Sequence, residues 1–142
     1  MRTKIILEIG CNHNGSMTQA KKMIREASKL GVWAVKFQKR DINSIPEKKK
    51  KQKRTDEHAY GSTYYLHRKA LEFSIKEIAE LKEYAEENGL TFICSAFDLK
   101  SANELVGLEL DYIKLPSQCL QDNQLFKYLI KSQCQNGRYV LA

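Results

Sequence analysis

Side chains that can move protons or bind anions stand at the ends of short apolar segments in this sequence. Glu8 closes the apolar segment 5–7 and precedes a polar, glycine-containing loop at 10–15. A carboxylate can act as a general acid or base, lysines supply positive charge for phosphate or carboxylate groups, and serine hydroxyls add hydrogen-bond donors. The side chains that fit this chemistry are Glu8, Lys36, Lys114, Ser95 and Ser117. Together they predict a site for an anionic substrate.

The elements that must position these side chains alternate along the chain. Apolar segments predict five strands, at 5–8, 33–38, 91–96, 111–115 and 139–142. Apolar residues at helical spacing predict helices at 16–30, at 74–89, from 101 onward and around 125–130. Strands that alternate with helices, without a reversal, predict a parallel sheet covered by helices.

Three helix starts carry the signature of a capping box, in which a serine is followed three residues later by Glu or Gln. The three pairs are Ser16 with Gln19, Ser74 with Glu77, and Ser101 with Glu104. Each pair predicts that a helix begins at its serine, because the two side chains satisfy the free backbone donors of the first turn.

The length of 142 residues is compatible with two parallel α/β architectures. A doubly wound domain would be complete at this size, whereas a (β/α)8 barrel of about 250 residues would be cut near its middle. An apolar final strand with no helix after it favours the second. We therefore expect an incomplete (β/α)8 TIM barrel of about four βα units plus the start of a fifth strand, with residues 1–142 as its N-terminal half.

Strand alternation places the polar candidates on one rim. Glu8 ends the first strand, Lys36 and Gln38 share a face of the second, and Tyr112 and Lys114 share a face of the fourth. The remaining candidates for the same rim are Ser95, Phe97 and Ser117. Barrel enzymes build their sites at the carboxyl ends of the strands, so the pattern predicts a site there. A structural Glu–Lys ion pair is the alternative.

The loop 10–15 adds two candidates, Asn12 and His13. His13 is of a type that binds metals, but a single histidine in a polar loop is more often a hydrogen-bonding group. No set of residues within the chain has the composition and spacing of a metal site. We expect Asn12 and His13 to be loop contacts and no metal to be bound by this chain alone.

A long basic connection, at about 39–65, separates the second strand from the second predicted helix. Its basic residues are Lys48, Lys49, Lys50, Lys51, Lys53 and Arg54, which account for all but one unit of the net charge of +7. The connection lacks periodicity, so a solvated loop is expected. The alternative is a polyanion-binding segment, although the absence of interleaved aromatic residues disfavours nucleic acid.

The four cysteines, Cys11, Cys94, Cys119 and Cys134, show neither a metal-binding nor a disulfide spacing. The first apolar segment is too short for a signal peptide, and no segment approaches the roughly 18 residues of a membrane span. These features predict a cytoplasmic protein with reduced thiols and no membrane partner.

Five motifs, in their order and spacing, resemble the N-terminal half of the sialic acid synthases, the N-acetylneuraminate synthase family of phosphoenolpyruvate-condensing barrels. The motifs are EIGCNHNGS at 8–16, VKFQKR at 35–40, LEF at 71–73, CSAFD at 94–98 and YIKLPS at 112–117. The resemblance covers nearly the whole chain. The basic connection and the last ten residues are its least characteristic parts.

The resemblance implies a metal-dependent condensation of phosphoenolpyruvate with an N-acetylated amino sugar, such as N-acetylmannosamine, to give a nonulosonate and phosphate. It implies that Lys36, Ser95, Lys114 and Ser117 hold phosphoenolpyruvate, that Gln38 and Phe97 face the sugar, and that Glu8 is the acid or base. It also implies Mn²⁺ or Mg²⁺ held mostly by the second half of the barrel, and a homodimer completed by a C-terminal sugar-binding domain. Neither part lies within residues 1–142.

One departure from the family lies after the last motif. Many relatives continue with glycine and an acidic residue, where this chain has Gln118 and Cys119. The identity of the acceptor sugar therefore stays open. Two other hypotheses remain: a non-catalytic half-barrel that binds polyanions through residues 48–54, and a different sugar-phosphate lyase or isomerase, against which the loop 10–15 argues.

Overall fold

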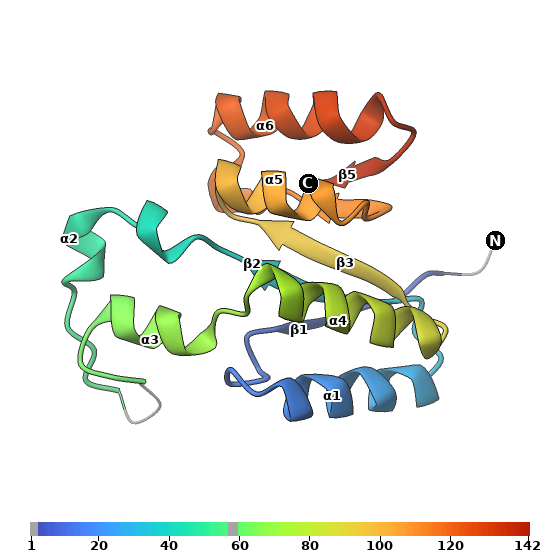
Figure 1. Ribbon diagram of the computed structural model, residues 1–142, viewed down its shortest axis with the longest axis horizontal. Coiled ribbons are helices and arrows are strands. Elements are labelled where there is room, and N and C mark those ends of the chain that lie inside the picture. The colour runs from blue at the N-terminus through green and yellow to red at the C-terminus, as the bar shows by residue number, and fades with distance from the viewer. Residues whose placement is uncertain (1–2, 57–59) are drawn as a thin grey trace.

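The computed structural model describes residues 3–56 and 60–142 and contains a five-stranded parallel sheet (Figure 1). The strands lie in chain order and are β1 (Ile6–Gly10), β2 (Ala34–Lys39), β3 (Thr91–Ala96), β4 (Tyr112–Lys114) and β5 (Tyr139–Leu141). Every neighbouring pair is parallel. All five predicted strands are present, and the predicted partial TIM barrel is confirmed.

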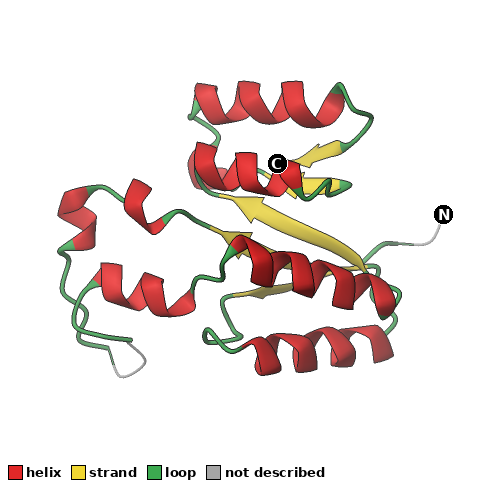
Figure 2. Ribbon diagram, in the orientation of Figure 1, coloured by secondary structure: helices red, strands yellow, loops and turns green. Residues whose placement is uncertain are grey.

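Helices connect the strands and cover one face of the sheet (Figure 2). The connecting helices are α1 (Met17–Lys29), α4 (Ile75–Glu87), α5 (Leu99–Gly107) and α6 (Asn123–Leu129). A π-helical segment, Ile130–Cys134, extends α6 toward β5. Figure 1 shows α1 and α4 side by side, and α1 contacts β1 whereas α4 contacts β3.

Alternate strand residues form the core between the sheet and these helices. The strand residues in this core are Ile9, Val35, Phe37, Phe92, Cys94, Ala96 and Ile113, and Leu115 joins them just after β4. On the other face, side chains at the two edges of the sheet are exposed, Ile6 by 38% and Tyr139 by 58%, whereas Ile93 in the middle is buried. Tyr112 stacks on Tyr139 on this face, with ring centroids 5.0 Å apart.

The helix starts agree with two of the three predicted capping positions. Ser74 and Glu77 form the complete capping box of α4, and the Ser16 hydroxyl accepts a bond from the Gln19 amide at 3.2 Å. The box predicted at Ser101 is wrong: α5 begins at Leu99, and its first turn is capped by Asp98, which accepts from the Ser101 amide at 2.8 Å. A carboxylate caps a helix as well as a hydroxyl does, and Asp98 comes first along the chain.

The connection at 39–65 is also different from the loop that the sequence predicts. It contains a 3-10 turn, Ile42–Ser44, the short helix α2 (Glu47–Lys50) and the start of α3 (Tyr64–Leu71). An antiparallel bridge between Lys53 and Thr63 closes the far end. Residues 57–59 of the connection lie outside the described part of the chain. The connection therefore carries helices that pack beside the rim of the sheet.

Candidate active site at the carboxyl ends of the strands

The strand register brings the predicted polar residues together in two neighbouring rows. Glu8 of β1 is opposite Lys36 of β2. One step further along, Gln38 of β2 is opposite Ser95 of β3, which is opposite Lys114 of β4. Neighbouring strands lie about 4.8 Å apart, so residues in one row are within reach of a single small substrate. The rim predicted from alternation is therefore present.

Glu8 is held by Lys36 and Gln38 of β2. Its carboxylate forms an ion pair with Lys36 and accepts a bond from the Gln38 side-chain amide at 3.4 Å. An irregularity in the β1–β2 register between Glu8 and Gly10 accompanies this arrangement. A Cβ atom at Gly10 would lie only 3.0 Å from the Glu8 carboxylate, so a larger residue at this position would crowd the carboxylate and glycine avoids the clash.

The two lysines of the rim act on one another. Burial, followed by the positive charge of Lys114, lowers the pKa of Lys36. Ser95, between their strands, is almost fully buried, at 2% exposure. An anion bound between the two lysines would relieve their repulsion, and the Ser95 hydroxyl lies in the same row to donate to it. The local electrostatics therefore suit a phosphate or a carboxylate.

Ser117 follows β4 and opens a short 3-10 turn, Ser117–Cys119, after Pro116. Its side chain is exposed at the rim, as is that of Gln118. Cys119 is buried, and its thiol lies 3.5 Å from the backbone carbonyl of Phe97. The residue that departs from the family pattern therefore packs against the end of β3.

Phe97 lies just beyond β3, and its ring packs beneath the guanidinium group of Arg40, 3.6 Å from the ring centroid. A cavity of about 160 Å³ opens beside this pair. Its lining includes Arg40, Lys49, Tyr64, Phe97 and Gln118. Gln38 and Phe97, both assigned to the sugar by resemblance, thus lie at different positions along the rim.

The loop 10–15 is fixed at several points. The exposed Asn12 donates from its side-chain amide to the carbonyl of Ile9 at 3.0 Å. His13 is only 3% exposed and stacks on Phe73 with ring centroids 4.2 Å apart. Its Nδ1 atom accepts from the Gly15 amide at 3.1 Å. This packing supports the structural role of His13 rather than that of a metal ligand.

Burial lowers the pKa of His13 below its ordinary value of 6.5, and the charge of Arg68 adds to this lowering. As the pH falls through 6.5, the unfolded chain therefore binds a proton more readily than the folded one, so acid weakens the fold. We expect the free energy of unfolding to fall below that pH by up to about 1.4 kcal/mol per pH unit for this one group.

Urea unfolding at a series of pH values measures this dependence. A His13→Gln variant should show a shallower loss of stability in acid. Part of the slope should remain, because the pKa of His67 is also lowered, chiefly by burial. An identical slope in the two proteins would contradict the assignment to His13.

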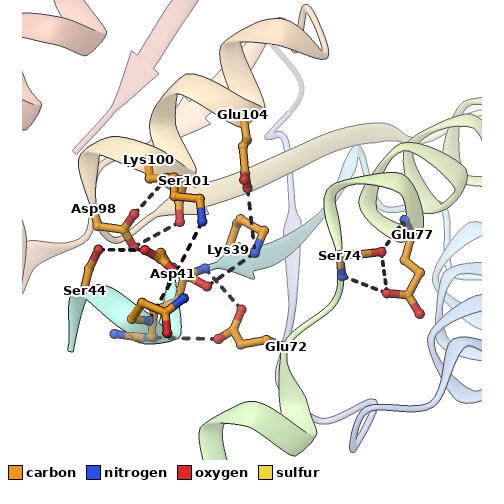
Figure 3. A network of polar contacts seen from close by, with 12 residues as sticks. Lys39, Asp41, Ser44, Glu72, Ser74, Glu77, Asp98, Lys100, Ser101 and Glu104 are labelled. Carbon is orange, nitrogen blue, oxygen red and sulfur yellow. Dashed lines mark hydrogen bonds and ion pairs between the residues drawn. The ribbon is translucent and has the colours of Figure 1, made fainter. Parts of the chain in front are cut away.

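A buried charged cluster that the sequence does not predict lies behind the rim. Glu72 lies between Arg68, at 2.9 Å, and Arg40, at 3.8 Å. Figure 3 shows Glu72 beside Lys39, which reaches Glu104 at 3.9 Å. The LEF motif at 71–73 was a signal for Glu72, but no sequence pattern paired it with Arg68.

The described part of the chain contains neither a cluster of potential metal ligands nor a helix that could cross a membrane. Across residues 3–56 and 60–142, no three His, Cys, Asp or Glu side chains come together as metal ligands do. No ligand set for the metal that the family resemblance implies is assigned among these residues. Among the same residues, no helix has both the length and the apolar character that a membrane crossing requires.

Known proteins match this chain over most of its length. Human N-acetylneuraminate-9-phosphate synthase is 38% identical over 135 residues, which cover 94% of this chain and 36% of that protein. The N,N'-diacetyllegionaminic acid synthase of Legionella pneumophila is 38% identical over 117 residues, covering 80% of this chain and 32% of that protein. The chain thus spans about a third of the length of these relatives.

A solved structure shows the same fold. The N-acetylneuraminic acid (sialic acid) synthetase from Leptospira borgpetersenii superposes with a TM-score of 0.80 at 27% identity, covering 99% of this chain and 44% of that one. The fold therefore defines this chain as part of a TIM-barrel protein. A model of the NeuB family matches residues 23–136. The chain belongs to the NeuB family of sialic-acid-synthase-like proteins.

Proposed function

We propose that this chain forms the phosphoenolpyruvate side of an enzyme that condenses phosphoenolpyruvate with an N-acetylated amino sugar. The observation that carries the proposal is the row formed by Gln38, Ser95 and Lys114, beside the ion pair of Glu8 and Lys36. Two lysines and a hydroxyl suit a substrate that has both a phosphate and a carboxylate. Membership of the NeuB family supports the same reaction.

In the proposed reaction, C3 of phosphoenolpyruvate attacks the aldehyde carbon of the open-chain sugar and forms the new carbon–carbon bond. The aldehyde oxygen takes up a proton, water adds at C2, and the C2–O bond to phosphate breaks. The products are a nonulosonate and inorganic phosphate. Lys36 and Lys114 bind the negative charges, Ser95 and Ser117 orient them, and Glu8 moves a proton at the reacting atoms.

The chain spans about a third of the length of the relatives it matches. The proposal also includes three features that the family resemblance implies: a divalent metal, a homodimer and a C-terminal sugar-binding domain. The metal would supply a Lewis acid at the reacting oxygens. A cytoplasmic location stays part of the proposal.

The names of the relatives leave two classes of acceptor. The human relative is named for a 9-phosphate product, whereas the Legionella relative is named for a diacetylated product without a phosphate. N-acetylmannosamine, its 6-phosphate and diamino sugars are therefore the acceptors to test.

The test is release of inorganic phosphate from phosphoenolpyruvate by the complete gene product, supplied with Mn²⁺ and each acceptor in turn. We expect release that requires one of these sugars, and mass spectrometry should detect the matching nonulosonate. Absence of sugar-dependent release across the whole panel would contradict the proposed function.

The basic segment 48–54 offers less support for a polyanion-binding function. Lys50 is paired with Glu47 at 2.8 Å and Arg54 with Asp56 at 2.7 Å, so part of its charge is already balanced. Lys49 lies over the Tyr64 ring at 5.0 Å. The segment therefore packs against α3 as part of the fold, and the condensation is the function we favour.

A further inference from the structure

A buried ion cluster connects the end of α3 to the residue that follows β2, behind the rim. Arg68 of α3 donates to the Glu72 carboxylate at 2.9 Å, and the backbone amide of Arg40, just after β2, donates to the other Glu72 oxygen at 3.1 Å. The Arg40 side chain adds an ion pair to Glu72 at 3.8 Å. The side chains of Arg68 and Glu72 are each only 10% exposed. We call Arg40, Arg68 and Glu72 the arginine–glutamate cluster.

Contacts run from this cluster to both residues that the family resemblance assigns to the sugar. On one side, Arg68 lies 3.5 Å from the Cys11 sulfur, and the Cys11 thiol in turn donates to the side-chain oxygen of Gln38 at 3.6 Å. On the other side, the guanidinium group of Arg40 covers the ring of Phe97. The cluster therefore touches Phe97 directly and Gln38 through a single residue.

The cluster does not contact the phosphoenolpyruvate residues in the same way. Within the described ranges, Arg40, Arg68 and Glu72 form no hydrogen bond or ion pair with the predicted phosphoenolpyruvate ligands, which are Lys36, Ser95, Lys114 and Ser117. Its contacts at the rim are thus with the two residues assigned to the acceptor sugar, of which Gln38 also donates to Glu8.

Stability alone gives a poor account of this cluster. Replacing a buried ion pair with apolar side chains is often neutral or stabilising, because taking charges out of water is costly. Here the cost is visible: burial raises the pKa of Glu72 although two arginines face it. In addition, the buried Nε atoms of Arg40 and Arg68 have no hydrogen-bond partner among the described residues. A cluster that served only the fold would be expected to satisfy these donors.

We infer that Arg68 and Glu72 are positioning residues for the acceptor sugar, acting through Cys11 and Gln38 on one side and through Arg40 and Phe97 on the other. The inference rests on the proposed function and deepens it. The planar guanidinium groups of Arg68 and Arg40 hold Cys11 and Phe97, respectively, in fixed orientations, because their donors have a rigid geometry. Removing one member lets Gln38 and Phe97 shift relative to the bound phosphoenolpyruvate.

The experiment compares KM values for the two substrates in the complete gene product. In an Arg68→Gln variant, we expect the KM for the preferred amino sugar to rise about tenfold to a hundredfold, because Gln38 and Phe97 no longer hold the sugar in its binding geometry; this corresponds to about 1.4–2.7 kcal/mol of binding free energy. The KM for phosphoenolpyruvate should change by less than about twofold. Arg68→Lys keeps the positive charge but lacks the planar guanidinium group, so its KM for the sugar should lie between those of Arg68→Gln and the unsubstituted protein.

Two further variants make the result interpretable. Lys69→Gln alters an exposed residue of the same helix and should leave both KM values unchanged. If Arg68→Gln fails to fold, as an unfolding curve would show, Cys11→Ala breaks the link to Gln38 with a smaller change and should give the same split between the two KM values.

The outcomes separate this inference from the function on which it rests. Parallel rises in both KM values, or no change in either, would overturn the positioning role while leaving the condensation intact. Failure of the unsubstituted protein to release phosphate with any sugar would instead overturn the proposed function, and the inference with it.

Discussion

Replacement of Glu8 by glutamine is expected to lower kcat for sugar-dependent phosphate release by about 10²–10⁴-fold, the usual contribution of a general acid or base. Glutamine keeps the size of the side chain and a partner for Gln38, but it cannot exchange a proton and loses the ion pair with Lys36. The measurement is steady-state phosphate release by the complete gene product at saturating concentrations of both substrates.

A matched control is available on the outside of the barrel. Glu83 is exposed on α4, away from the rim, so Glu83→Gln removes one carboxylate without touching the candidate site. Its kcat should equal that of the unsubstituted protein. If Glu8→Gln lowers kcat by less than about threefold, the loss is smaller than a general acid or base contributes, and this role is excluded for Glu8.

The largest effect on stability is expected for Phe37→Ala, at about 3–5 kcal/mol. Phe37 is fully buried, and its ring stacks on Phe92 at 5.3 Å and lies 6.0 Å from the His13 ring. The substitution leaves a cavity between the sheet and the helices, which these neighbours can fill only in part. The free energy of unfolding, measured with urea, reports the loss.

Phe126→Ala is the matched control, because it makes the same substitution at an exposed position. Phe126 is 41% exposed on α6, so its truncation should cost about 1–2 kcal/mol, less than that of the fully buried Phe37. Equal losses in the two variants would mean that the core around Phe37 relaxes to fill the space, contrary to the close packing of this face of the sheet.

Periodicity allowed much of the fold and the rim to be predicted. The strand β3 coincides with its predicted range, and the two-residue repeat placed Lys36 and Gln38 on the face that the register shows. Such predictions succeed because a strand buried on one face leaves its side chains only two directions. The motifs predicted a resemblance to this family, and the match of the NeuB family model to residues 23–136 confirms it.

The remainder depended on contacts between distant segments. Helix α3 was missed because its buried residues, Arg68 and Leu71, include a charge that reads as solvent-exposed in the sequence. The burial of Arg68 requires Glu72 on the next turn and Cys11 from a different loop. The Ser101 prediction failed because two good caps, Asp98 and Ser101, compete within one turn.

The fixed loop at 10–15 has a consequence for the free energy of substrate binding. His13 anchors it in the core, and a side chain at Gly15, where φ is +73°, would collide with the Ala70 carbonyl at the end of α3. Ordering a flexible backbone costs about 1–2 kcal/mol per residue. This loop is already ordered in the folded chain. A substrate that binds at the Glu8 side of the rim therefore does not have to order the loop, and the entropic cost of binding is lower.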